Sequence, residues 1–191
     1  VVDPSPDSLA ALERRAAEAG VTVRGLQGDA ADVAELLPAG TADLVLCHSV
    51  LEYVEDPAAA LAALARLLRP GGVISVLAAN AVAAVLHRAV AGRLDEALQA
   101  LADPAGRWGD RDPVPRRFTR DELTALLTAA GFTVIETHGV RVFADLVPSR
   151  LVDIVPGGAD HLIELEEAAA THPALRDIAT QLHLLARVPE G

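Results

Sequence analysis

The sequence contains no methionine, a single cysteine (Cys47) and no apolar run that approaches the ~18 residues of a membrane-spanning helix. The lone cysteine excludes a disulfide framework and a multi-cysteine zinc site, and it fits a reducing cytoplasm. No metal site is predicted. A basic segment followed by an apolar one is absent from the start, so no signal peptide is predicted either. Without methionine, Val1 is not an initiating residue, and we expect native residues before it.

The composition is that of an acidic globular protein. The 191 residues are 51% hydrophobic and 23% charged, which predicts one folded domain over residues 1–191. Sixteen Lys and Arg against 27 Asp and Glu give a net charge of −11. The field of such a molecule repels phosphate, which argues against broad binding to nucleic acid or to an anionic membrane. We expect a soluble, cytoplasmic protein, and no pattern specifies an oligomeric state.

Helical and strand patterns alternate along the chain. Helical spacing of apolar residues predicts helices over 5–20, 32–37, 57–68, 81–102, 119–130 and 159–170. Short apolar runs predict strands over 1–2, 21–26, 43–47, 73–77, 132–137 and 180–188, and the run over 43–47 is typical of a strand buried on both faces. Residues 103–117, rich in Pro, Gly and charge, predict an exposed loop, and 139–146 an irregular or extended segment. The alternation favours a doubly wound α/β sheet.

Polar residues follow three of the predicted strands, at the edge where such sheets bind ligands. Asp3 is placed to accept hydrogen bonds from the ribose of a nucleotide-like cofactor, or to cap the next helix. Asp29 is placed to accept from an adenine amino group, or to form an ordinary turn. His48 closes the strand over 43–47, where a structural hydrogen bond is the plainer interpretation.

The order of these features resembles a known superfamily. Residues 43–77, DLVLCHSVLEYVEDPAAALAALARLLRPGGVISVL, combine a D-L-V strand, a V-E-D-P loop, a leucine-striped helix and an L-R-P-G-G turn. With VVDPSPDSLAALERRAAEAG (1–20) and FTRDELTALLTAAGFTVIET (118–137), they resemble the class I S-adenosylmethionine-dependent methyltransferases. The resemblance implies a Rossmann-like methyltransferase sheet and S-adenosylmethionine as the cofactor. It also implies cofactor contact by Asp3, Ala30, Ala31 and His48.

One element of that superfamily is missing from the sequence. Its glycine-rich loop, which cradles the cofactor, follows a central strand located just before the segment that Val1 and Val2 match. The resemblance therefore implies roughly 40–70 preceding residues, enough for a strand–helix unit and a lead-in helix. Without that strand, its two neighbours would leave backbone groups unpaired.

A narrower resemblance concerns the acceptor. LCHSVLEYVEDP (46–57), Asn80, His87 with Val90-Ala91-Gly92, GVRVF (139–143) and the closing segment 162–189 are similar to the bacterial tRNA carboxymethoxyuridine methyltransferases. That family methylates the carboxylate of a modified wobble uridine, which implies tRNA as a partner. The sequence departs from the pattern at Ala78 and Ala79 and over 103–117. A small-molecule acceptor, such as a quinone or a secondary metabolite, is the alternative.

The acceptor chemistry suggests further residues. A carboxylate, with a pKa near ~4, is already ionised at neutral pH and needs no general base, so no catalytic residue is assigned. Arg141 is the candidate for binding that carboxylate, or else a surface arginine. Asn80 and His87 are candidates for the acceptor pocket. For a hydroxyl or amine acceptor, His48 or His87 would have to be the base.

A hypothesis of another class is a non-catalytic scaffold that keeps the methyltransferase fold. The glycine-rich loop would distinguish the two, because its presence upstream supports catalysis and its loss supports a scaffold. A nicotinamide-dependent dehydrogenase fits less well, since L-R-P-G-G and the V-E-D-P loop have no place in that pattern.

Overall fold

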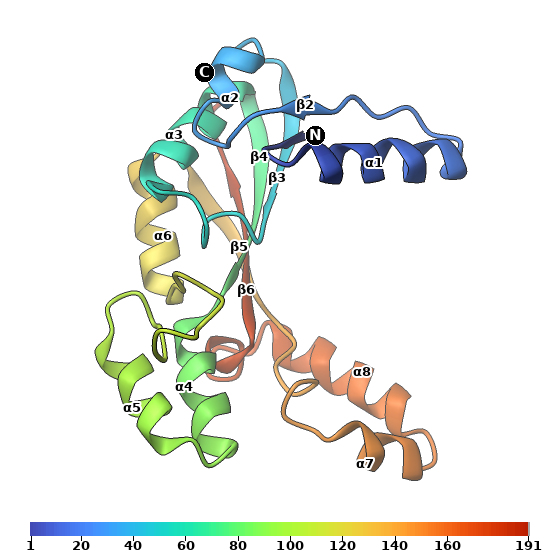
Figure 1. Cartoon of the computed structure of the whole chain (residues 1–191), viewed down its shortest axis with the longest axis vertical. Coiled ribbons are helices and arrows are strands. Elements are labelled where there is room, and N and C mark those ends of the chain that lie inside the picture. The colour runs from blue at the N-terminus through green and yellow to red at the C-terminus, as the bar shows by residue number, and fades with distance from the viewer. Residues whose placement is uncertain (191) are drawn as a thin grey trace.

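The strands of the chain form two separate sheets over residues 1–190, the part that the computed structural model describes (Figure 1). β1 (Val2–Asp3) and β2 (Leu26–Gln27) pair in parallel. The larger sheet has the order β3–β4–β6–β5, with β3 parallel to β4 and β6 antiparallel to both of its neighbours. Its strands are β3 (Ala42–His48), β4 (Leu68–Ala79), β5 (Thr133–Val140) and β6 (Gln181–Arg187).

Local capping signals determine where the main helices begin. In α1 (Pro6–Ala19) the Ser5 side chain accepts from the Ser8 N–H, and in α6 (Arg120–Ala129) Thr119 and Glu122 form the predicted capping box. In α3 (Pro57–Leu67) Asp56 accepts from two N–H groups of the first turn. The other helices are α2 (Val33–Leu36), α4 (Ala81–Val90), α5 (Leu94–Ala102), α7 (Ser149–Ile154) and α8 (Gly158–Ala170), with a 3-10 turn, η1, at Arg176–Ile178.

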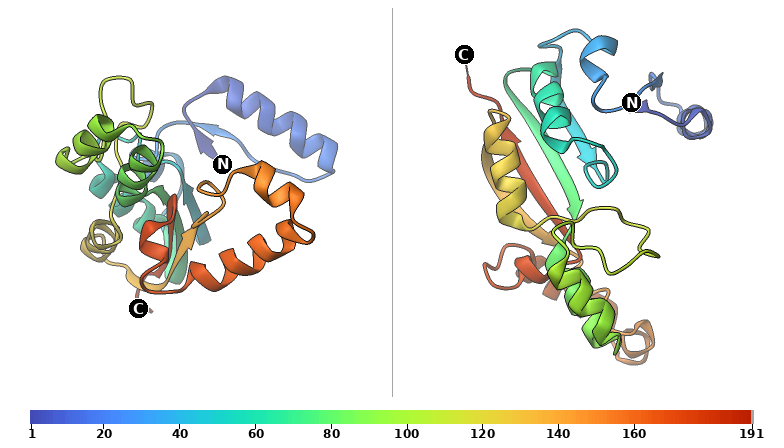
Figure 2. Two further views of the ribbon diagram at one scale, coloured as in Figure 1. Left: turned by 90° about the horizontal axis from the view of Figure 1, so that it is seen from below. Right: turned by 60° about the vertical axis from the view of Figure 1, so that its left-hand side comes forward.

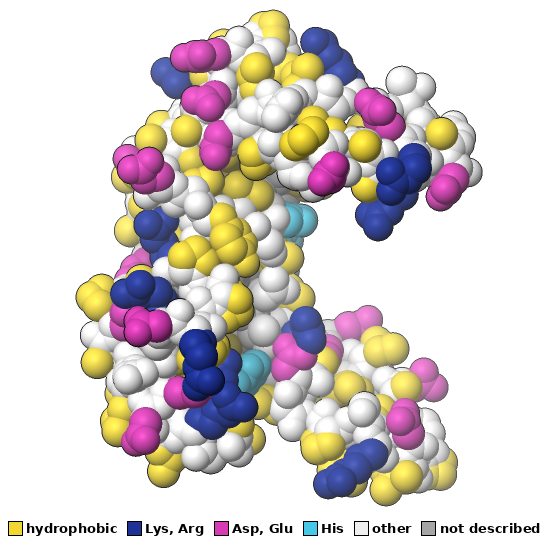
Figure 3. Space-filling model, viewed as in Figure 1, with side chains coloured by type: hydrophobic (Ala, Val, Ile, Leu, Met, Phe, Trp, Pro, Cys, Tyr) yellow, Lys and Arg dark blue, Asp and Glu magenta, His cyan; other side chains and the backbone are white. Residues whose placement is uncertain are grey.

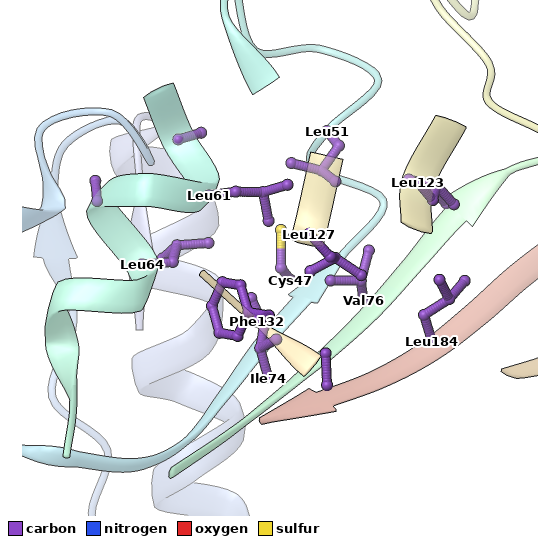
Figure 4. Packing of buried hydrophobic residues seen from close by; sticks show 14 of the residues in the cluster. Cys47, Leu51, Leu61, Leu64, Ile74, Val76, Leu123, Leu127, Phe132 and Leu184 are labelled. Atoms are coloured by element: carbon purple, nitrogen blue, oxygen red, sulfur yellow. The ribbon is translucent and has the colours of Figure 1, made fainter. Parts of the chain in front are cut away.

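The main hydrophobic core lies between α3, α6 and one face of the larger sheet (Figure 4). Leu61 of α3 and Leu127 of α6 meet Ile74 and Val76 of β4 and Leu184 of β6, all fully buried. Burying each such side chain contributes about 1.5–3 kcal/mol, so this layer holds the four strands as one platform.

The opposite face of the larger sheet is not covered by a helix within residues 1–190 (Figures 1 and 2). Leu44 and Leu46 of β3 are 54% and 64% exposed there, and Ile135 of β5 is 48% exposed. The unit of β1, α1 and β2 extends on this side of the sheet as one arm, and α7 with α8 as another. A hollow lies between the two arms (Figure 3). The prediction that residues 43–47 are buried on both faces is therefore wrong: only the face that carries Cys47 is covered.

Other predicted elements differ in extent. The strand expected over 21–26 is limited to β2, because β1 offers only two residues to pair with. The single helix expected over 81–102 is split into α4 and α5 at Gly92, which has a left-handed φ of 73°. The turn around Gly71 is an excursion within β4, where the register with β3 shifts. The predictions did not include α7.

The remaining patterns agree with the structure. The mixed sheet with helices between successive strands is the expected Rossmann-like methyltransferase arrangement, here in two pieces. Residues 103–117 do form a loop, although Trp108 within it is buried. Within residues 1–190, no helix is both long enough and apolar enough to cross a membrane.

Candidate functional site

A groove of about 550 Å³ separates the two sheets. The end of β1, the loop after β2 and the strand β3 with the loop that follows it form its walls. Most of the lining is apolar, and its polar side chains are those of Asp3, Asp29, Ser49 and Tyr53. Three of the five residues predicted to contact a cofactor, Asp3, Asp29 and Ala30, therefore lie together. Ala31 and His48 are not part of the lining but are each adjacent in sequence to a lining residue.

Asp3 does not cap α1, because the N-cap of that helix is Ser5, and its contact with a ribose stays a prediction. One oxygen, Oδ1, accepts a hydrogen bond of 2.8 Å from the Ser5 N–H and so shapes the turn into α1. Within residues 1–190, Oδ2 has no hydrogen-bond donor, which leaves it available to a ligand in the groove. A half-buried carboxylate with one free oxygen is suited to accepting from vicinal hydroxyls.

The Asp29 side chain also acts locally. Its Oδ1 accepts a hydrogen bond of 3.3 Å from the Ala31 N–H, which closes the turn after β2. That turn directs the backbone of Ala30 to the groove, and Asp29 itself is exposed there. The turn interpretation of Asp29 is confirmed, and its contact with an adenine amino group stays a prediction.

His48 belongs to a polar row that crosses the open face of the larger sheet. Its Nε2 is 2.8 Å from the Ser75 hydroxyl, which is also 2.8 Å from Nε2 of His183. The His138 ring stacks on His183, with centroids 5.5 Å apart. Burial, and then the neighbouring imidazoles of His138 and His48, lower the pKa of His183. The hydrogen bond expected of His48 is confirmed, whereas Ser75, His183 and His138 were not foreseen because they are far apart in sequence.

The predicted acceptor residues gather at the carboxyl ends of β4 and β5. The Asn80 N–H donates to the Thr180 carbonyl, and the Thr180 N–H donates to the Arg141 carbonyl, each at 3.1 Å. These bonds place Asn80 and Arg141 on either side of Thr180. The guanidinium of Arg141 is paired with Asp145, whose Oδ2 accepts from the Thr180 hydroxyl at 2.6 Å. Asp145 was not predicted.

Asn80 is a structural residue of this edge. It is 2% exposed, its Oδ1 caps α4 through the Val82 N–H, and its Nδ2 donates to the carbonyls of Asp177 and Ala179. Both amide hydrogens are therefore used within the protein. Asn80 supports the acceptor region without a donor to offer to a ligand.

His87 lies two turns into α4 and is half-buried, not exposed. Burial lowers its pKa, Asp145 opposes the shift, and Arg141 and Arg88 lower the pKa further. Its Nε2 is buried and has no hydrogen-bond partner within residues 1–190. The charges of Asp145, Arg141 and Arg88 thus all act on the imidazole of His87.

Cys47 of the groove lining is not a nucleophile, and Arg116 and Arg117 are not free cations. Burial, with a smaller effect of Glu52, raises the pKa of the Cys47 thiol to about 12, so no thiolate forms at neutral pH. Arg116 donates to the carbonyls of Val54 and Glu55, and Arg117 is paired with Asp112. Arg116 and Arg117 are thus both committed to contacts within the protein.

Comparisons with known proteins agree with this architecture. Residues 1–76 match the family model described as a methyltransferase domain. The tRNA 5-carboxymethoxyuridine methyltransferase of Escherichia coli O157:H7 is 33% identical over 149 residues, which are 78% of this chain and 55% of that protein. The trans-aconitate 2-methyltransferase of Methylobacterium nodulans is 35% identical over 136 residues, 70% of this chain and 47% of that protein. The chain thus spans about half the length of these relatives.

Solved structures extend the likeness to nearly the whole chain. An S-adenosylmethionine-dependent methyltransferase from Thermotoga maritima is 20% identical, with a TM-score of 0.62 over 97% of this chain and 71% of that one. A second, from Mesorhizobium loti, is also 20% identical, with a TM-score of 0.59 over 97% of this chain and 78% of that one. At such identities the likeness concerns the fold alone. Over residues 1–76 the chain thus matches a methyltransferase domain, and its fold is that of the S-adenosylmethionine-dependent methyltransferases.

Proposed function

We propose that the protein transfers a methyl group from S-adenosylmethionine to a carboxylate acceptor. The observation that carries the proposal is the convergence of Asp3, Asp29 and Ala30 on one groove at the carboxyl ends of β1 and β2. The free Oδ2 of Asp3 is suited to a ribose, and the turn at Asp29 and Ala30 to the amino group of an adenine. When bound, S-adenosylmethionine supplies a methyl group on a cationic sulfur. The sulfur leaves as a neutral thioether, which needs no metal.

The unpaired edges of β1 and β3 beside the groove favour a further parallel strand in the complete protein. β1 and β3 each pair with one neighbour only within residues 1–190, and both line the groove. A strand between them would pair with both edges and join the two sheets. It would also bring its own carboxyl end to the cofactor groove.

A carboxylate acceptor is supported by Arg141 and by the relatives. The Arg141 side chain is 56% exposed at the carboxyl end of β5, and a guanidinium matches a carboxylate bidentately. The named substrates of two relatives, a carboxymethoxyuridine in tRNA and trans-aconitate, both carry carboxylates. The role of this chain is then to orient the acceptor and exclude water, because an ionised carboxylate needs no base. Our more specific proposal is the carboxylate of a modified wobble uridine in tRNA.

A second candidate is a small-molecule hydroxyl acceptor. The ubiquinone biosynthesis O-methyltransferase of Azorhizobium caulinodans is 31% identical over 140 residues, 73% of this chain. His48 supports this candidate, since it lies between the groove residues Cys47 and Ser49 and contacts the Ser75 hydroxyl. It would accept the hydroxyl proton of such a substrate.

The decisive experiment is calorimetric titration of the complete gene product with S-adenosylmethionine and S-adenosylhomocysteine. We expect micromolar binding that Asp3→Ala weakens roughly 10–100-fold, the equivalent of about 1.5–3 kcal/mol for a charged hydrogen-bond acceptor. Asp7→Ala, an exposed acid in the first turn of α1, is the matched control and should bind as wild type. No binding by an intact, folded product would leave a scaffold with the methyltransferase fold.

Acceptor assays then separate the substrate classes. Labelled methyl transfer is compared on tRNA containing carboxymethoxyuridine, on trans-aconitate and on a catechol that mimics a quinone precursor. Base-stable label on the catechol alone would favour the hydroxyl acceptor. Base-labile label, the signature of a methyl ester, on either acid would favour the carboxylate, and label on tRNA would identify the wobble uridine.

A further inference from the structure

The turn that follows β5 presents Arg141 in an unusual conformation. Arg141 has a φ of 60°, in the left-handed region that costs a non-glycine residue about 1–2 kcal/mol. Val142, the next residue, is fully buried. A strained residue next to a buried one persists only if surrounding contacts hold the backbone in place.

Glu166 of α8 supplies those contacts. Its carboxylate accepts hydrogen bonds from three successive backbone N–H groups: from Val142 to Oε2 at 2.8 Å, and from Phe143 and Ala144 to Oε1 at 2.7 Å each. Three consecutive N–H groups around an anion form a concave nest, and hydrogen bonds to a charged acceptor are about twice as strong as neutral ones. The carboxylate thus fixes the backbone directly after Arg141.

The same turn sets the position of the guanidinium. Nη2 of Arg141 pairs with Asp145, and Asp145 is itself held by the Thr180 hydroxyl. A guanidinium has five N–H donors, and more than half of this side chain is exposed. The pair with Asp145 therefore orients the guanidinium while leaving other N–H groups to a ligand.

From these contacts we propose that Glu166 is a positioning residue for acceptor binding, which acts by holding residues 142–144 so that Arg141 can receive the acceptor carboxylate. The inference rests on the proposed function, because it takes Arg141 as the carboxylate contact. The Glu166 carboxylate of α8 then determines the geometry of the acceptor site from a position that the acceptor does not touch.

The test measures binding to the complete gene product saturated with S-adenosylhomocysteine. The probes are the nucleoside 5-carboxymethoxyuridine, its methyl ester, which lacks the carboxylate, and trans-aconitate. We expect Glu166→Gln, whose amide presents N–H groups to at least one nest donor, to weaken binding of the acids roughly tenfold or more. Binding of the ester and of S-adenosylhomocysteine should not change. Glu167→Gln, the neighbouring exposed position on α8, is the matched control and should behave as wild type.

A double-mutant cycle separates positioning from general stabilisation. In an Arg141→Ala background, Glu166→Gln should cause no further loss of acid binding, because the residue acts through the guanidinium. If Glu166→Gln does not fold, Glu166→Asp replaces it: the charge is kept, the carboxylate is retracted by one methylene, and a smaller selective loss is expected.

Three results would overturn the inference: an equal loss for acid and ester, a loss that persists without Arg141, or no Arg141-dependent binding of either acid while S-adenosylhomocysteine binds. Absence of S-adenosylhomocysteine binding would instead overturn the proposed function, and this inference with it.

Discussion

Single polar residues on the open face of the larger sheet form a connected row. His183 is an example, since it lies in the middle of β6, shares the Ser75 hydroxyl with His48 and stacks on His138. The Ser75 hydroxyl has one proton, so it donates to one imidazole and accepts from the other. The imidazole that accepts this proton must have an unprotonated Nε2.

This row predicts a pH dependence of stability. Burial, then His138 and His48, lower the folded-state pKa of His183 from its ordinary value of 6.5, with Glu136 opposing. The folded state therefore binds this proton less readily than the unfolded chain does. The stabilisation is fully present above about pH 6.5 and is lost as the pH falls through the unfolded value towards the lowered folded one.

Urea denaturation of the protein at pH 7.5 and 5.5 checks this prediction. We expect a lower free energy of unfolding at pH 5.5, by a fraction of the roughly 1.4 kcal/mol per pH unit that one proton gives at most, because the ring is partly exposed. His183→Gln should flatten the dependence, whereas His161→Gln on the exposed side of α8 should not. Equal slopes in wild type and His183→Gln would contradict it.

Among the elements, the loop between α5 and α6 is organised around one carboxylate. Asp112 accepts from the backbone N–H groups of Trp108 and Val114, and it forms an ion pair with Arg117 in which the Asp112 side chain is fully buried. Burial opposes ionisation, but these hydrogen bonds outweigh it and lower the pKa of Asp112. Arg88 of α4 stacks on Trp108 at 3.9 Å and ties the loop to the helix.

Asp112→Asn should loosen this loop, because it leaves the buried guanidinium of Arg117 without its anion. Trp108 is the only tryptophan of the sequence, so its fluorescence reports on the loop alone. We expect a red-shifted emission and stronger quenching by acrylamide, with a loss of about 3–5 kcal/mol in stability. Asp110→Asn, an exposed acid of the same loop, should leave the spectrum unchanged. An unshifted Asp112→Asn spectrum would mean that the ion pair does not hold the loop.

For the whole molecule, the open sheet face and the groove between the sheets are the dominant features. One face of the larger sheet packs under α3 and α6, and Leu44 and Leu46 of β3 are exposed on the other. The two arms enclose a hollow on that side (Figure 3). β3 is also an edge strand of this sheet, and apolar edge strands pair with other chains unless something covers them.

This arrangement predicts that residues 1–191 expressed alone differ from the complete gene product. Alone, they should bind a hydrophobic dye, self-associate and unfold with low cooperativity, because the unit of β1 and β2 and the larger sheet have few shared contacts. In the complete product, hydrogen exchange at the β3 amides should be slow. A monomeric, cooperatively unfolding and highly stable 1–191 fragment would contradict both this prediction and the proposed additional strand.

The sequence by itself determined the features that depend on neighbours in the chain. The caps at Ser5 and Thr119, the leucine stripe of α3 and the strand over 43–47 all follow from contacts within a few residues. The placement of Asp3 and Asp29 at the ends of strands follows in the same way, which is why this half of the site was predictable.

The tertiary structure decided everything that depends on distant pairs. Glu166 is separated from the N–H groups it binds by more than 20 residues, and a glutamate on a helix rich in acidic residues is read as solvated. Asn80 was predicted as a candidate for the acceptor pocket, but its amide donates to carbonyls nearly 100 residues away in the sequence. Burial of a strand face depends on what packs over it, and no local pattern contains that information. The hydrophobicity of β3 predicts burial, but only the packing shows which of its faces is buried.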